Sequence, residues 1–354
     1  MLLALARFGL LRGSAPTARP RARARHAVAG PLGGSNSGGT LVLPGLAALA
    51  ESYDALLLDQ FGVLHDGSTA LPGAVDCFEK LAAAGKKLVV LSNTSRRRDF
   101  AMRKLPQLGF DERLLAGFVC SGEQTWDVMH ASRRGQKVLW ITWADDFPAW
   151  QSDYLAGLDL TLAPADSADF VLAHGSMVLR DGSASPAQTG MMHSGEMSVA
   201  SEEALRTCAA RGLPMLCANP DFYVTLPSGE RGHMPGLVAQ RYEELGGTVT
   251  YFGKPHAPAF DACLDLLEGT GVPRSRVLHV GDSLRHDVAG ANAAGIDSLF
   301  VAEGIHAAEL GIAEGGARSA DDDEAGAPTA DALERVFAVY DGVRPTHTVS
   351  SFVW

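Results

Sequence analysis

The stretch LLLDQFGVLHDG, residues 56–67, sets a single carboxylate directly after an apolar run and follows it with a glycine-bearing turn. A short, continuous apolar run is typical of a strand that is buried on both faces in a parallel sheet. Asp59 would then stand at the carboxyl end of its strand, where open α/β sheets bind their ligands. The stretch therefore predicts both a fold class and the place of a site.

The rest of the chain repeats this pattern of strand and helix. PGAVDCFEKLAAAG begins with Pro72 and ends at Gly85, as helices commonly do, and KKLVVLSNTS after it is a second apolar strand. Towards the end of the chain, the helix signal PAFDACLDLLEGTG is followed by the strand candidates RVLHVGDS and IDSLFVAEG. Repeated units of this kind predict an α/β protein with a Rossmann-like, doubly wound parallel sheet.

The middle of the chain has a different pattern of strand and helix candidates, which indicates an inserted α/β domain. KVLWITW, ADFVLAH and LPMLCAN are short strand candidates separated by helical or Pro/Gly-rich pieces. The predicted parts are a transit peptide and flexible lead over 1–45, the core over 46–134, the insertion over 135–235 and the rest of the core over 236–354. Residues 314–328 are acidic and of low complexity, so we expect a solvated loop there.

Charge is unevenly distributed along the 354 residues. The net charge is −11, yet residues 1–50 contain six Arg and no acidic residue. An acid-free, Arg- and Ala-rich start is typical of a transit peptide, which predicts a mitochondrial or plastid protein. A basic tail on a cytoplasmic protein, or a nucleic-acid arm, is the alternative. The acidic remainder argues against nucleic acid as a partner.

Two further features limit the classes of function. The five cysteines show no Cys-x-x-Cys spacing, so we interpret them as buried thiols rather than a zinc site or a disulfide frame. No apolar run approaches the ~18 residues that span a bilayer, so no membrane partner is expected.

Polar groups follow four of the apolar strands, and this pattern predicts one shared crevice. They are Asp59 after LLL, Ser92 after LVVL, Lys254 after VTYFG and Asp282 after VLHVG. Each of them alone could be a helix cap or a turn residue. Asn93 stands beside Ser92, and Asp287 lies about one helical turn beyond Asp282, so the set together favours a binding site.

Two carboxylates and a lysine in one crevice suit phosphoryl transfer. Mg²⁺ prefers hard oxygen ligands, which Asp59 and Asp282 can supply. An aspartate can also attack phosphorus and form an aspartyl-phosphate. Lys254 would neutralise charge, while Ser92 and Asn93 would donate hydrogen bonds to phosphoryl oxygens. The sequence thus predicts Mg²⁺-dependent chemistry on a small phosphorylated substrate.

These motifs resemble the haloacid dehalogenase-like hydrolases, and within them class IIA, the branch of 4-nitrophenyl phosphatase-like and pyridoxal phosphatase-like enzymes. The matching pieces are DQFGVLHDG, VVLSNTS, FGKPH and VGDSLRHDVAGANAAG, in family order over about 50–305. The resemblance implies that the insertion is a cap domain and that Asp59 is the nucleophile.

The resemblance also assigns the metal site. It implies that Mg²⁺ is held by Asp59, Asp282 and the backbone carbonyl of Phe61. It also implies that Asp287 orients the metal site without binding the ion directly. By the same resemblance Ser92 binds the phosphoryl group and Lys254 supports it.

Phe61 departs from the family pattern. Related phosphatases typically carry a second aspartate two residues after the nucleophile, as the general acid that protonates the leaving group. A phenyl ring cannot carry a proton, and general acid–base help is worth about 10²–10⁴-fold in rate. The metal would be unaffected, since this position binds it through a backbone oxygen.

Three interpretations stay open. His65 or Asp66 in the following turn could act as the acid instead, although a surface position is the expectation for His65. The substrate could need no acid, as with acyl phosphates or other good leaving groups; dehalogenation is disfavoured because the resembling dehalogenases use no metal. The protein could also bind metal and a phosphometabolite without turnover.

The cap contributes weaker signals. Asn219 and Asp221 in LCANPDFYVTLPSG resemble cap residues that class IIA enzymes bring to the substrate, and an Asn-Pro-Asp turn is the alternative. His174 in VLAHGS is expected to be satisfied by local hydrogen bonds. A homo-oligomer formed through the cap is left open.

Overall fold

The computed structural model describes residues 41–147, 151–226, 230–312 and 327–354. The predicted transit peptide and nearly all of the acidic loop lie outside these residues, so both stay predictions. The lead predicted to run to residue 45 ends earlier, because Val42–Leu43 form an edge strand. Within the described ranges, no helix is long and apolar enough to cross a membrane.

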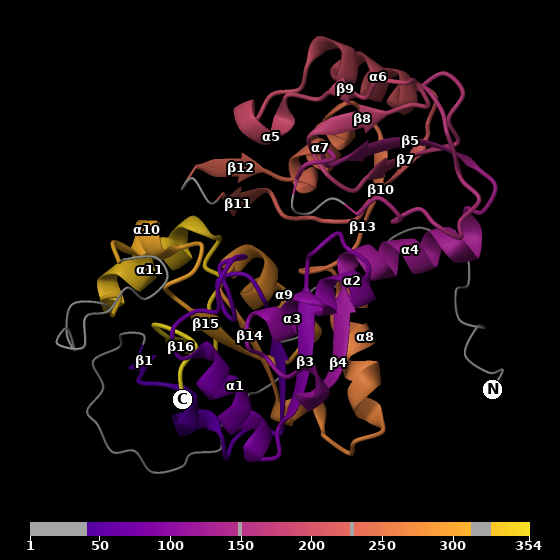
Figure 1. The fold of residues 1–354 in the computed structure, drawn as a ribbon. Coiled ribbons are helices and arrows are strands. Elements are labelled where there is room, and N and C mark those ends of the chain that lie inside the picture. Colours follow the sequence, from indigo (N-terminus) through magenta and orange to yellow (C-terminus); the bar gives the residue numbers. More distant parts are fainter. Residues whose placement is uncertain (1–40, 148–150, 227–229, 313–326) are drawn as a thin grey trace, which may run out of the picture. The chain divides into compact units, whose positions relative to one another are not determined.

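The first sheet has seven strands in the order β1-β16-β15-β14-β2-β3-β4, and all of its neighbours are parallel (Figure 1). Its strands are β1 (Val42–Leu43), β2 (Ala55–Leu58), β3 (Lys87–Ser92), β4 (Leu115–Cys120), β14 (Val277–Gly281), β15 (Asp297–Val301) and β16 (His347–Val349). This confirms the predicted Rossmann-like α/β core.

Both faces of the first sheet are covered, which explains the unbroken apolar runs. Leu56 and Leu58 pack in one cluster with α1 and its neighbours, while Leu57 packs on the other face with α8 and α9. The helices around this sheet are α1 (Ala74–Ala83), α2 (Arg98–Met102), α3 (Lys104–Gln107), α4 (Ser121–Ser132), α8 (Ala257–Glu268), α9 (Ala289–Ala294), α10 (Ala307–Leu310) and α11 (Ala330–Val339). Short turns of helix are η1 (Leu46–Leu49), η2 (Glu112–Leu114), η3 (Arg274–Arg276) and the π-helical η4 (Leu284–Val288).

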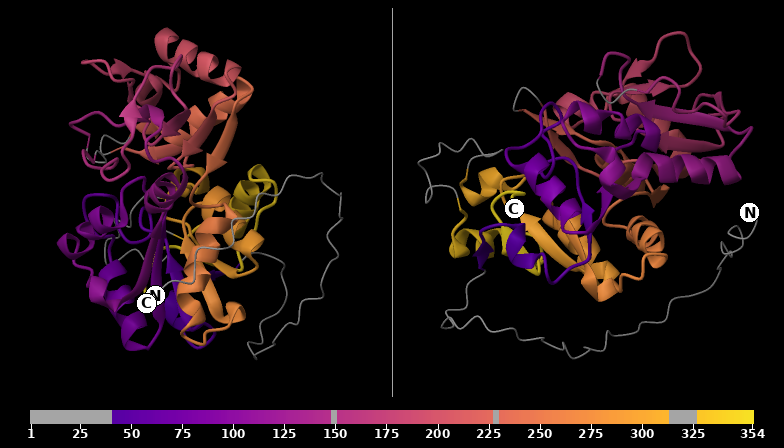
Figure 2. Two further views of the ribbon diagram at one scale, coloured as in Figure 1. Left: turned by 90° about the vertical axis from the view of Figure 1, so that its right-hand side faces the viewer. Right: turned by 60° about the horizontal axis from the view of Figure 1, so that its bottom comes forward.

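The second sheet is built from the middle of the chain, in the order β13-β10-β7-β5-β8-β9 with β6 beside β5 (Figures 1 and 2). Its strands are β5 (Lys137–Thr142), β6 (Thr161–Leu162), β7 (Phe170–Ala173), β8 (Val178–Arg180), β9 (Ala187–Gln188), β10 (Pro214–Cys217) and β13 (Thr248–Tyr251). The same domain holds α5 (Met191–Ser194), α6 (Val199–Ala210), α7 (Pro235–Glu244) and a hairpin of β11 (Tyr223–Thr225) with β12 (Arg231–His233). Strands β5, β7, β10 and β13 are parallel, and β8 and β9 are antiparallel.

This cap domain extends further than predicted. The sequence places the return to the core at residue 236, but β13 pairs with β10 from Pro214–Thr248 to Cys217–Tyr251. The chain therefore leaves the second sheet only after Tyr251, and the predicted boundary is wrong. A strand pattern reports burial and not the identity of the neighbouring strand, so β13 could not be assigned to a sheet from its residues.

The parallel strands of the two sheets meet at their carboxyl ends. Trp143 follows β5 and donates from Nε1 to Ser95 Oγ, 3.1 Å away. His174 follows β7 and donates from Nε2 to the Ser95 carbonyl oxygen at 3.0 Å. Ser95 itself lies just beyond β3 of the first sheet. The loop after β3 is therefore fastened to two strand ends of the cap.

His174 is hydrogen-bonded, as expected, although its Nε2 partner Ser95 belongs to the core and is not local, and the expectation of buried thiols is confirmed. His174 Nδ1 lies 2.8 Å from Thr142 Oγ1, and burial lowers the pKa of the ring to about 3, so the ring is neutral. All five cysteines lie in the described ranges, where they are buried and free.

Gly175 offers a test of the junction between the two sheets. A Cβ at this position would lie 2.4 Å from the Thr142 carbonyl carbon and 2.5 Å from the Trp143 amide nitrogen. Because backbone atoms cannot move aside cheaply, we expect Gly175→Ala to lower the free energy of unfolding by about 1–3 kcal/mol. The melting temperature, followed by circular dichroism, should fall by several degrees.

The matched control is Gly269→Ala at the end of α8, where a Cβ would meet no atom within 4 Å. Its melting temperature should stay close to that of the wild type. Equal melting temperatures for the two variants would show that the junction accommodates a side chain.

Candidate active site

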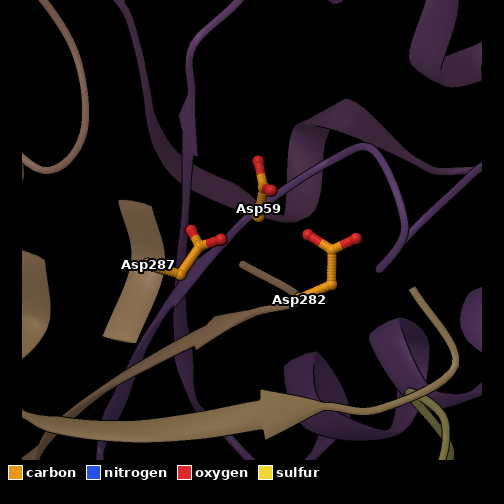
Figure 3. A group of neighbouring side chains, drawn as sticks. All are labelled: Asp59, Asp282 and Asp287. Carbon is orange, nitrogen blue, oxygen red and sulfur yellow. The ribbon is translucent and has the colours of Figure 1, made fainter. Parts of the chain in front are cut away.

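Three of the predicted site residues follow neighbouring strands of the first sheet, as expected. Asp59 follows β2, Asp282 follows β14 and Ser92 ends β3, and these strands lie in the order β14-β2-β3. The carboxylates of Asp59, Asp282 and Asp287 point into one shared space (Figure 3), with ligand oxygens within 4.8 Å of one another. The convergence predicted from strand direction is therefore present.

Lys254 reaches the same place from the segment between β13 of the cap and α8 of the core, and not from a strand of the first sheet. It lies just beyond β13, and its Nζ is 2.7 Å from Asp59 Oδ1 and 2.7 Å from Asp287 Oδ1. Burial alone would lower the pKa of this ammonium group, but the two carboxylates outweigh burial and raise it. Lys254 is thus a buried cation that ties a strand end of the cap to two acids of the core.

Asp287 is held on several sides. Besides Lys254, His279 Nε2 lies 2.8 Å from its Oδ1, and the Ser283 N–H donates to its Oδ2 at 3.0 Å. Burial would raise the pKa of this carboxyl, but Lys254 and His279 hold it well below the usual range. His279 was not among the predicted site residues, although a histidine inside the apolar run VLHVG is a visible signal.

Asp282 and Asp59 carry less compensated charge. Burial raises the pKa of Asp59 to about 6 despite the opposing effect of Lys254. Burial raises the pKa of Asp282 well above the usual range, and the charges of Asp59 and Asp287 raise it further. The Ile305 N–H donates a hydrogen bond to Asp282 Oδ2 at 2.8 Å.

The donor set fits a hard divalent cation. When all three buried carboxylates are ionised, they exceed the one ammonium group by two negative charges, and carboxylate oxygens are the ligands that Mg²⁺ prefers. Two loops also close tightly on Asp282: a Cβ would lie 1.9 Å from its Oδ2 at Gly62 and 2.2 Å at Gly304. Glycine at both positions lets the backbone approach this carboxylate.

Ser92 and Asn93 differ in how their side chains are used. Ser92 is buried, and its Oγ accepts a hydrogen bond from the Thr94 N–H at 3.3 Å. Asn93 accepts from the Lys254 N–H at 2.7 Å and donates from Nδ2 to the Lys254 carbonyl oxygen and to Asp221 Oδ1. Both N–H bonds of the Asn93 amide are thereby taken by the protein. The predicted contact of Asn93 with phosphoryl oxygens would have to come from its backbone.

The Asn219-Pro220-Asp221 segment forms a turn and also reaches the core. Asn219 Oδ1 accepts from the Asp221 N–H at 2.9 Å, as the turn interpretation expects. Asp221 Oδ1 in turn lies 2.8 Å from Asn93 Nδ2 and 3.4 Å from His286 Nδ1. Burial raises the pKa of Asp221 to about 6. Contact of Asn219 and Asp221 with substrate stays a prediction.

The turn after Asp59 folds inward, so the surface position expected for His65 is wrong. His65 is buried, and its Nδ1 accepts from the Gly67 N–H at 3.0 Å. The Gly62 N–H donates to the His65 carbonyl oxygen at 3.0 Å, and this bond closes the turn. Phe61 is 42% exposed, and its ring meets the His65 ring edge-on with centroids 5.7 Å apart.

Neither predicted substitute for the general acid is suited to that role. Burial, with the charge of Lys104, lowers the pKa of His65 to about 4, so the ring is neutral near pH 7. Asp66 Oδ1 accepts from the N–H groups of Ser68 and Thr69, both at 2.7 Å. The slight burial of Asp66 would raise the pKa of its carboxyl, but these hydrogen bonds hold that pKa below the usual range. Asp66 is therefore ionised and has no proton to give.

Comparison with known proteins agrees with this geometry. A model of the haloacid dehalogenase-like hydrolases matches residues 56–148, and a HAD-hydrolase-like model matches residues 251–336. D-glycerol 3-phosphate phosphatase of Mycobacterium tuberculosis is 30% identical over 269 residues, which cover 74% of this chain and 67% of the relative.

Solved structures show the same fold. A haloacid dehalogenase-like hydrolase from Brucella suis is 26% identical with a TM-score of 0.66, covering 88% of this chain and 100% of that one. Glycerol phosphate phosphatase from Mycobacterium tuberculosis, in complex with magnesium, is 22% identical with a TM-score of 0.56 and shares the fold over 86% of this chain and 76% of its own. From its fold, its site and its relatives, the chain belongs to the haloacid dehalogenase-like hydrolase family.

Proposed function

We propose that the protein is a Mg²⁺-dependent phosphatase that hydrolyses a small phosphorylated metabolite through an aspartyl-phosphate on Asp59. The observation that carries the proposal is the buried Asp59 carboxylate at the end of a central strand, held by Lys254 and facing Asp282. The relative that acts on D-glycerol 3-phosphate supports a small phosphate ester as substrate.

The metal would be held by Asp59, Asp282 and the backbone carbonyl of Phe61. Asp287 would orient this site without binding the metal directly. Bound there, Mg²⁺ would supply positive charge to the phosphoryl oxygens. Lys254 adds a second positive charge to the same group, and its bond to Asp59 Oδ1 fixes the direction of the nucleophile.

The reaction has two steps. An Asp59 carboxylate oxygen attacks phosphorus, and the bond from phosphorus to the leaving-group oxygen breaks with its electron pair going to that oxygen. Water then attacks the phosphorus of the aspartyl-phosphate, so that inorganic phosphate leaves and the carboxylate is restored. Ser92 would donate its hydroxyl hydrogen bond to the phosphoryl group in both steps.

Phe61 cannot give a proton to the leaving-group oxygen as it departs. His65 is neutral and Asp66 is ionised, so the proposal favours substrates whose leaving group departs as an anion, such as acyl or aryl phosphates. Phe61 at the position of the acid also favours a second candidate, a weakened protein that binds a phosphometabolite with little turnover.

Asp59→Asn tests the nucleophile. Because an amide cannot form the aspartyl-phosphate, we expect phosphate release from a panel of phosphometabolites with Mg²⁺ to fall at least about 10³-fold. The control is Asp76→Asn on α1, which removes an exposed carboxylate that pairs with Lys80 and should retain activity. Full activity in Asp59→Asn would exclude this residue as the nucleophile.

Chelation and thermal unfolding test the metal site together. We expect a chelator to abolish phosphate release and added Mg²⁺ to restore it. Mg²⁺ at 100 times its dissociation constant should stabilise the wild type by about 2.7 kcal/mol, and Asp282→Asn should lose most of this effect. Asp76→Asn should keep it. A stabilisation in Asp282→Asn equal to that of the wild type would place the ion elsewhere.

Phe61→Asp tests the missing acid. It should raise the hydrolysis of alkyl phosphates by a factor within the about 10²–10⁴-fold that general acids supply, and that of aryl phosphates less. Phe61→Asn is the matched control, since an asparagine side chain has a shape similar to that of aspartate and carries no acidic proton. No gain in Phe61→Asp would show that protonation does not limit the enzyme. A selective loss of alkyl phosphate hydrolysis in Asp221→Asn would instead identify Asp221 as the acid.

A further inference from the structure

Two exposed apolar residues stand next in the chain to glycines that pack on the Asp282 carboxylate. Phe61 is 42% exposed and Ile305 is 41% exposed, in a protein that buries most of its large apolar residues. Each is the chain neighbour of a glycine packed on Asp282, Phe61 of Gly62 and Ile305 of Gly304. An exposed apolar pair beside buried polar groups is a common feature of ligand sites.

The positions of both residues are fixed by the backbone. The Ile305 N–H donates to Asp282 Oδ2 at 2.8 Å, which fixes its main chain against the acid. The Phe61 ring lies over Gly67, where a Cβ would come within 2.7 Å of the ring carbons, and it also contacts His65. Taking a Phe or Ile side chain out of water is favourable, and the exposure of these two side chains leaves part of that gain unused. A bound apolar group would recover part of that energy.

The cap hairpin starts beside η4, the segment that carries Asp287. Phe222, directly before β11, has its ring 4.0 Å from the Arg285 guanidinium, and Arg285 lies on η4 together with Asp287. Tyr223 is the next residue and is 39% exposed, with Arg231 over its ring at 4.8 Å. The first residues of the hairpin are therefore aromatic and are fastened to the segment that carries Asp287.

We propose that Phe61 and Ile305 form a binding surface for the leaving group of the substrate, and that the substrate class is phosphate monoesters whose leaving group has an apolar, aryl-sized face. This inference rests on the proposed function, because it concerns the same site. An aryl oxygen can leave phosphorus as a phenolate, with the electron pair of the broken bond and without a proton from the protein. Phe61 then accounts for two properties at once: it supplies no acid, and it supplies a contact for a leaving group that needs none.

The experiment compares two esters with leaving groups of similar acidity and different apolar area, phenyl phosphate and 2-naphthyl phosphate, each with Mg²⁺. We expect kcat/KM of the wild type to favour the naphthyl ester by about 5- to 10-fold, as the extra ring is taken from water. Ile305→Ala keeps the backbone N–H that binds Asp282 and should reduce this ratio severalfold, mainly through KM. Phe61→Ala should reduce it as well, and Phe61→Leu should restore part of it.

Val339→Ala is the matched control, because Val339 is a 76% exposed apolar residue on α11 that takes no part in the site. Its ratio should equal that of the wild type. A wild-type ratio near one, or an unchanged ratio in Ile305→Ala, would overturn the binding surface while leaving the phosphatase activity standing. If neither ester is hydrolysed, the proposed function fails. The dissociation constants of the two esters are then measured by calorimetry on the same variants. The binding surface is overturned if the wild type binds both esters equally, or if Ile305→Ala leaves the ratio of the two constants unchanged.

Discussion

The centre of this protein depends on one buried ammonium group. Lys254 Nζ lies 2.7 Å from a carboxylate oxygen of Asp59 and 2.7 Å from one of Asp287. Removing one partner of a buried charge cluster typically costs about 3–5 kcal/mol, because it leaves an uncompensated charge in the interior. The lysine lies in the segment that joins β13 of the cap to α8 of the core, and the acids lie in the core, so the site is built at the junction of the two sheets.

Asp287 and Asp282 show how one site separates the behaviour of identical side chains. Asp287 has Lys254, His279 and a backbone N–H as partners and keeps its charge easily. The charges of Asp59 and Asp287 act on Asp282 more strongly than the opposite charge of Lys254 does. Ionising the buried Asp282 carboxylate is therefore costly. Environments that push the pKa values of like groups apart are typical of reactive sites.

Strand direction made much of the core site predictable. Asp59, Ser92 and Asp282 each end an apolar run, and parallel strands bring their carboxyl ends to one edge. The origin of Lys254 was not predictable, since the residues of β13 do not reveal that β10 is its neighbour. The burial of His65 was missed because it depends on a turn closed by the Gly62 N–H. Likewise, nothing in the residues around Trp143 indicates that its ring nitrogen binds Ser95.

The contacts of Ser95 and Lys254 have a consequence for how such proteins can be recombined. The cap holds the loop after β3 through Trp143 and His174, and Lys254, in the segment that joins β13 of the cap to α8 of the core, lies beside Asp59. A chimera that joins the cap of one relative to the core of another would change the selectivity and the reactive centre together. Substitutions on either side of this junction are therefore expected to be tolerated best in matched pairs.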